Sequence, residues 1–153
     1  MGRDIVSVIL GYVVVAVTVF VTFTIAYLVL GPDRAFKPDS YDIATTWAGI
    51  SIILSFIAAV AGGFVCAVVA KRPTPSKALA ALVLILGLLL AIPSLTRDET
   101  RPTMRTGDAG NVEAIQGAQQ PLWITLLNPF LGAIGVLFGA GLALRNRSEP
   151  KLD

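Results

Sequence analysis

Residues 55–70 read SFIAAVAGGFVCAVVA, a segment without a charged side chain in which small residues make up more than half of the positions. A helix surrounded by lipid gains little from apolar contact with its neighbours, so close approach of backbones becomes a main means of association. Small side chains four residues apart lie along one side of a helix and permit that approach. The segment therefore predicts a membrane helix with one face suited to packing.

The same pattern recurs along the chain and defines a predicted small-residue strip. When residues 47–70 and 122–144 are aligned on their tryptophans, Ala59 matches Gly135 and Gly63 matches Gly139. A tandem duplication and convergence under shared constraints both explain this match. The strip either joins helices within the chain or docks another subunit. We expect the helix-packing interface to contain Ser55, Ala59, Gly62, Gly63, Ala67, Gly135, Gly139 and Ala143.

Four long apolar segments dominate the sequence, at about residues 5–30, 47–70, 78–95 and 122–144. Charged residues form only 14% of the chain, against about 25% in a typical soluble domain. At 1.5 Å per residue the first segment would be roughly 39 Å long, more than the ~30 Å hydrocarbon core of a bilayer, so it is expected to tilt. A bundle of buried helices in a soluble protein fits this composition poorly. The sequence predicts an all-α membrane protein, a single domain of four transmembrane helices packed as a bundle.

The charges between these segments predict the orientation. The short link 71–77 and the C-terminal tail are rich in basic residues, whereas acidic residues outnumber basic ones in the longer loops 31–46 and 96–121. Basic loops stay on the cytoplasmic side, so both termini and the link are expected there. Trp47 and Trp123 begin the second and fourth segments and are expected to anchor them at the interface. The expected cytoplasmic basic residues are Lys71, Arg72, Lys77, Arg145 and Arg147.

Several chemistries lack the residues that they require. The chain has no histidine and one cysteine, Cys66, which excludes imidazole ligation of a metal or haem and a CxxC redox pair. No carboxylate or basic side chain interrupts the four segments, so a proton relay has no evident carrier. The net charge of +2 is too small to indicate nucleic-acid binding. We expect no enzyme activity, no catalytic residue, no cofactor and no metal site.

Two polar features remain inside or between the segments. Asn128-Pro129 places an amide and a missing backbone donor within the fourth segment, as a hinge, a ligand contact or a hydrogen bond to a neighbouring helix. The loop 96–121 is either a solvated loop or a docking element, and Asn111 can cap a short helical turn that ends at Gly117.

The stretch AGGFVCAVVAKRPTPSKALAALVLILGLLL, residues 61–90, resembles small uncharacterised four-span bacterial inner-membrane proteins. The resemblance implies a bacterial inner (plasma) membrane and brings no activity with it. The small-residue faces and the missing chemistries lead us to expect a non-catalytic accessory or assembly subunit of a larger, energy-transducing membrane complex. Its partners would be the lipid bilayer and other membrane-protein subunits. The competing hypothesis is an oligomeric channel or transporter for a neutral solute or lipid, and a homo-oligomer would favour this second hypothesis.

Overall fold

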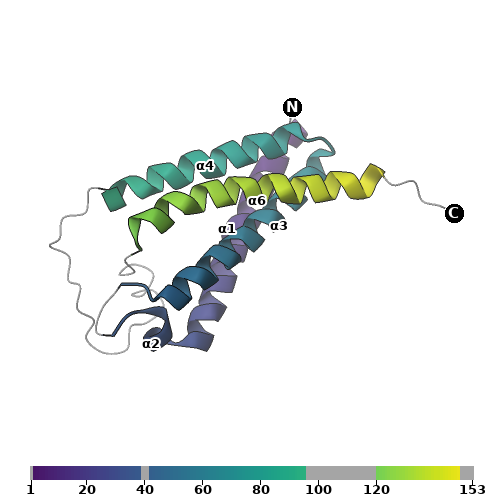
Figure 1. The fold of residues 1–153 in the computed structure, drawn as a ribbon. Helices are drawn as coiled ribbons and strands as arrows, with labels where there is room; N and C mark the ends of the chain where they lie inside the picture. The colour runs from purple at the N-terminus through teal and green to yellow at the C-terminus, as the bar shows by residue number, and fades with distance from the viewer. Residues whose placement is uncertain (1, 39–41, 96–119, 149–153) are drawn as a thin grey trace.

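The computed structural model describes residues 2–38, 42–95 and 120–148, and almost all of them are helical. The elements in chain order are α1 (Gly2–Leu30), α2 (Pro32–Ala35), α3 (Thr45–Ala70), α4 (Thr74–Leu95) and α6 (Leu122–Ser148) (Figure 1). Four of them, α1, α3, α4 and α6, are long and apolar enough to cross a membrane. The predicted all-α fold with four such helices packed together is confirmed.

The helices extend beyond the predicted apolar segments. The structure begins α1 at Gly2 and α4 at Thr74, and it continues α6 to Ser148. Pro75 lies in the first turn of α4, where the missing N–H would have no helical partner in any case. The connection between α3 and α4 therefore shortens to residues 71–73, and Lys71 closes α3 in the left-handed region with φ 61°.

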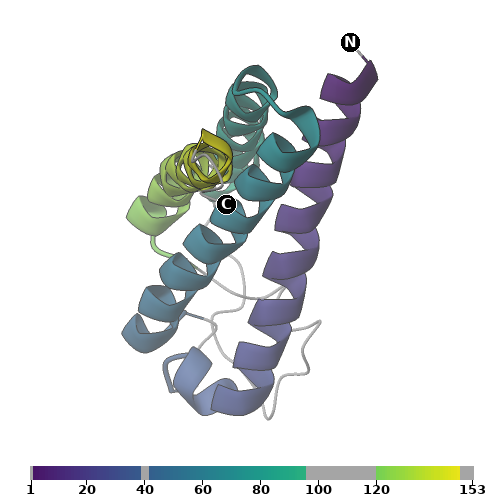
Figure 2. The same ribbon diagram turned by 90° about the vertical axis from the view of Figure 1, so that its right-hand side faces the viewer.

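The helices form two antiparallel pairs that share a central contact. Helix α3 packs mainly on α6 and α1, and α4 packs mainly on α6. The two central helices, α3 and α6, run in the same direction, while α1 and α4 run the opposite way (Figures 1 and 2). We call the end with Arg3 and residues 71–77 the basic end, and the end with α2 and the start of α3 the loop end.

Small residues occupy the closest helix contacts. A Cβ atom added to Gly63 would lie 2.0 Å from the carbonyl oxygen of Val136, and one added to Gly139 would lie 2.0 Å from that of Val60. A Cβ on Gly62 would lie 2.6 Å from the carbonyl oxygen of Gly11. No side chain fits such gaps, so these glycines set the spacing of α3 from α6 and α1.

Aromatic residues pack at the loop end. The chain after α1 folds back over α2 and an antiparallel bridge between Phe36 and Ile43, which brings Phe36 against Tyr27. Trp47 packs edge-on to Phe23 and Tyr27, with ring centroids 6.0 and 6.1 Å apart. These contacts tie α1 to the start of α3. The expected loop 96–121, including Asn111, lies almost entirely outside the described residues.

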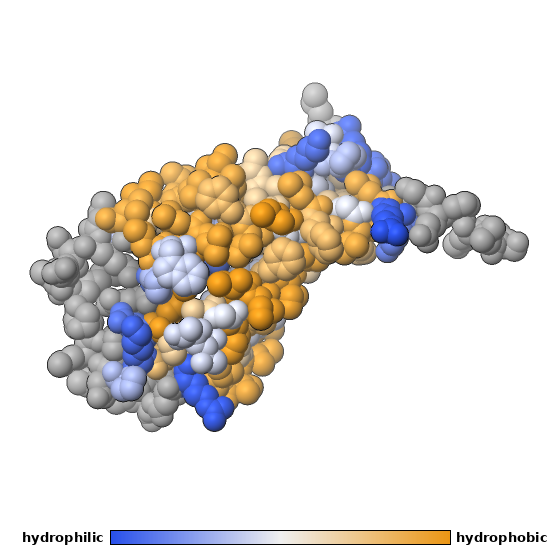
Figure 3. All heavy atoms as spheres, viewed as in Figure 1, coloured by the Kyte–Doolittle hydropathy of each residue, from blue (hydrophilic) through white to orange (hydrophobic). Residues whose placement is uncertain are grey.

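The surface divides into an apolar middle and polar ends. Figure 3 shows apolar side chains across the middle of one face, with hydrophilic groups toward the two ends. Helix α1 is the least covered of the four long helices, and its buried residues are Ser7, Gly11 and Tyr27. An apolar surface of this extent fits lipid better than water.

Candidate ligand-binding cleft

The small-residue strip predicted from the sequence lies at contacts within the chain. Ala59, Gly62, Gly63, Ala67 and Ala143 are all buried. A Cβ on Gly135 would lie 2.8 Å from the Cβ of Ala59, so α6 meets α3 there as it does at Gly139. Ser55 is half-buried and lines a cleft instead. The close approaches at Gly63 and Gly139 leave no room for a helix of another subunit.

The cleft has a volume of about 340 Å³ and is lined by all four long helices. Helices α1 and α4 lie close together near the basic end, where a Cβ on Gly11 would lie 2.7 Å from Leu79, and they diverge toward the loop end (Figure 1). The volume falls in the range of about 300–1,000 Å³ typical of small-molecule sites. Its polar lining residues are Tyr12, Ser55, Gln120, Thr125 and Asn128.

Asn128 gives the cleft an unsatisfied polar group. The Oδ1 atom of its side chain is buried and has no hydrogen-bond partner. Pro129 follows inside α6 and has no N–H, so the carbonyl of Thr125 loses the donor that a regular helix would supply. Thr125 and Asn128 both line the cleft. Both residues with an acceptor that lacks its usual donor therefore belong to the lining of the cleft.

Packing of α4 against α6 supports this wall. A Cβ on Gly87 would lie 2.7 Å from the ring of Pro129, so the glycine makes room for the proline. A Cβ on Gly132 would lie 2.9 Å from the side chain of Val83. The part of α6 around Pro129 is thus held by α4, which supports the backbone that carries Asn128.

The rest of the described lining is apolar or neutral. Among the residues that the structure describes, no Asp, Glu, Lys or Arg lines the cleft. An unpaired charge at membrane depth is energetically unfavourable, so an ionised ligand would find no counter-charge here. Among the described residues, no group of three or more His, Cys, Asp or Glu could hold a metal ion. Buried Cys66 packs near Gly11 between α1 and α3, away from the cleft lining.

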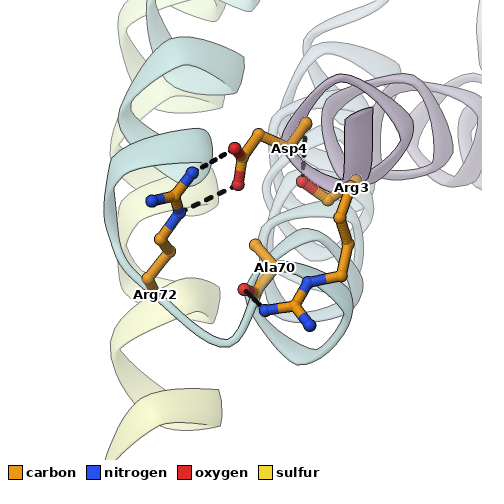
Figure 4. A network of polar contacts seen from close by, with 5 residues as sticks. Arg3, Asp4, Ala70 and Arg72 are labelled. Carbon is orange, nitrogen blue, oxygen red and sulfur yellow. Dashed lines mark hydrogen bonds and ion pairs between the residues drawn. The ribbon is translucent and has the colours of Figure 1, made fainter. Parts of the chain in front are cut away.

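The basic end holds a separate polar cluster (Figure 4). The Arg72 guanidinium donates to both oxygens of the Asp4 carboxylate, from Nε at 2.9 Å and from one terminal nitrogen. These hydrogen bonds and the charge attraction hold the pKa of Arg72 above its usual value. Arg3 donates to the carbonyl of Ala70 at the end of α3, at 3.1 Å. Residues Asp4 and Arg72 therefore join α1 to the α3–α4 turn.

The other sequence-predicted residues are divided between surface and core. Lys71, Lys77 and Arg145 are exposed, and Arg147 lies in the last turn of α6. Trp123 is 61% exposed, whereas Trp47 is 8% exposed within the aromatic cluster. The two tryptophans expected to play one role thus have different surroundings.

Sequence reasoning did not find the cleft, because its lining comes from four helices whose pairing was unknown. Asn128-Pro129 was the one local signal that pointed to it. Comparisons with protein-family models, with curated proteins and with solved structures found no match.

Proposed function

We propose that this is a non-catalytic integral membrane protein that binds an uncharged amphiphile, taken from the bilayer, in the cleft between its helices. The single observation that carries the proposal is at Asn128, a residue of the cleft lining whose buried Oδ1 has no hydrogen-bond partner. A buried polar atom without a partner is destabilising by about 1–3 kcal/mol. A ligand that donates a hydrogen bond there would remove this penalty.

The lining determines the class of ligand. Apolar walls favour a hydrocarbon body. The described part of the lining has no charged side chain, which disfavours an ionised ligand. The Asn128 Oδ1 acceptor, which has no partner, selects a ligand with a hydroxyl or amide donor. A neutral lipid or a small alcohol has this combination. The protein would then carry a neutral solute or lipid, or let it pass through the membrane.

Photolabelling in vesicles of phosphatidylcholine tests the proposal. The probes are a medium-chain alcohol that carries a diazirine and the methyl ether of the same alcohol, which cannot donate a hydrogen bond. We expect several-fold more labelling by the alcohol than by the ether. Asn128→Leu should remove the difference between the two probes, while Thr22→Val, whose hydroxyl bonds only its own helix, should preserve it.

A second pair of variants tests the place of binding. Ser55→Leu should fill the cleft from α3 and lower labelling by both probes. Gly49→Leu adds the same side chain to α3 at an exposed position with open space around it and should change nothing. Equal labelling by alcohol and ether in the natural protein, or no effect of Asn128→Leu, would exclude the proposal.

The exposure of α1 favours a second proposal, that of an accessory subunit in a larger, energy-transducing complex of a bacterial inner membrane. The close contacts of the small-residue strip are filled within the chain, so docking would use the uncovered side of α1, which includes Val13, Val17 and Phe20. Native mass spectrometry after extraction in mild detergent tests this proposal. Bound polypeptides of other sequence would support it, and a monomer or homo-oligomer would oppose it.

A further inference from the structure

A second groove lies at the basic end, between the first turns of α1 and the start of α4. It has a volume of about 340 Å³ and is separate from the cleft that contains Asn128. Its apolar wall is formed by Ile5, Val8, Ile9 and Ala78. Ile5 and Ile9 are 62% and 55% exposed, so the wall is open to its surroundings.

Arg72 and Asp4 lie at the polar edge of this groove. Two nitrogens of the guanidinium bind the Asp4 carboxylate, and Figure 4 shows the third nitrogen pointing away from it. The Arg72 side chain is 55% exposed, while that of Asp4 is 22% exposed. The guanidinium can therefore accept a second anion without leaving the first.

The charge around the groove favours an anion. Arg3, Lys71, Arg72 and Lys77 lie at this end, and among the described residues Asp4 is the one acid there. Basic pockets between membrane helices at the cytoplasmic side are suited to anionic head groups. The positive edge and the apolar wall meet in one groove, as the head group and the acyl chain do in one lipid.

We propose that this groove binds an anionic phospholipid, independently of the ligand in the cleft. One acyl chain lies along Ile5, Ile9 and Ala78, and the phosphate lies at Arg72. The apolar wall distinguishes this occupant from a free phosphate, and the excess of cations distinguishes it from a zwitterionic lipid. The Asp4 carboxylate offsets part of the guanidinium charge and so limits the affinity for the phosphate.

Native mass spectrometry from mixed micelles tests this proposal. The micelles contain equal amounts of phosphatidylglycerol and phosphatidylcholine with the same acyl chains, and the measured quantity is the ratio of the two lipid-bound forms. We expect a ratio of at least five, with no retention of glycerol phosphate. Arg72→Gln should bring the ratio close to one. Asp4→Asn should raise the ratio, because it removes the negative charge that offsets the guanidinium beside the groove.

Two tryptophan substitutions on α4 control for loss of the ion pair. Ala78→Trp should fill the groove, leave Asp4 and Arg72 in place and lower retention of both lipids. Ala81→Trp, at an exposed position outside the groove, should leave retention unchanged. A ratio of one in the natural protein would overturn the proposal. It would also fail if Asp4→Asn lowered the ratio as Arg72→Gln does, or if glycerol phosphate displaced the lipid.

Discussion

Gly63 on α3 lies so close to Val136 on α6 that an added Cβ would be 2.0 Å from the Val136 carbonyl oxygen. Gly139 on α6 has the same relationship to Val60 on α3, also at 2.0 Å. The spacing in sequence from Val60 to Val136 equals that from Gly63 to Gly139, and Ala59 faces Gly135 at that spacing as well. The two parallel helices therefore meet with local two-fold symmetry. Residues that match when the two helix sequences are aligned therefore make equivalent contacts across the α3–α6 interface.

Gly63→Leu is expected to separate α3 from α6, because the clash is with backbone and no rotamer relieves it. Overpacking of this kind destabilises by about 3 kcal/mol or more. Leu84→Ala removes a half-buried side chain of α4 and should lower the free energy of unfolding by on the order of 1 kcal/mol. Unfolding in a denaturing-detergent titration, followed by circular dichroism, measures both. Equal losses of stability in the two variants would show that Gly63 does not lie on the main packing face of α3.

The symmetric contact makes a matched prediction for α6. Gly139→Leu should destabilise the protein as much as Gly63→Leu, within about 1 kcal/mol, since both clash with a carbonyl at the same distance. Gly141→Leu is the control, because nothing lies within 4 Å of a Cβ at that exposed position. The same titration compares the three variants. A loss at position 141 comparable to that at 139 would contradict the contact.

Much of this architecture follows from local composition, and the rest does not. Runs without charge predict the four long helices, and the spacing of Gly63 and Gly139 predicts that their faces pack closely. The alignment cannot predict that these two helices pack on each other rather than on another subunit, because small residues specify close approach without specifying a partner. Helix ends were underestimated, since Thr74 and Pro75 look like a polar link but begin α4.

The candidate sites depend on pairing between distant segments. Asn128 could be singled out as a polar residue in an apolar helix, but its lack of a partner depends on which residues of α1, α3 and α4 face it. Asp4 and Arg72 are far apart in sequence and meet only because α1 packs beside the α3–α4 turn. Trp47 lies where an interfacial anchor is expected, yet Phe23 and Tyr27 bury it.

Asn128→Leu should stabilise the protein while it abolishes preference for the alcohol probe. The substitution removes a buried acceptor that has no partner, and the expected gain in the free energy of unfolding is about 1 kcal/mol. Thermal unfolding in detergent without added ligand measures it, with Thr22→Val as the control. A loss of stability would mean that the amide is held by the protein, and the cleft would then lose its unsatisfied group.

The two tryptophans should differ in their access to lipid. Trp47 is 8% and Trp123 is 61% exposed, so bromine atoms on lipid chains should quench Trp123 more strongly. Trp47→Phe and Trp123→Phe each leave a single fluorophore, because the chain has two tryptophans. Emission in vesicles of brominated and ordinary phosphatidylcholine gives the quenched fraction. Equal quenching in the two variants would contradict the burial of Trp47.

The distribution of charge predicts the orientation, and labelling of single cysteines tests it. In a Cys66→Ala background, Lys77→Cys should be protected from a membrane-impermeant maleimide added to intact bacterial cells, since basic segments stay in the cytoplasm. Lys37→Cys, an exposed position at the opposite end of the molecule, should be labelled. Both should react once the membrane is permeabilised. Labelling of position 77 and protection of position 37 in intact cells would reverse the orientation and place the phospholipid groove in the other leaflet.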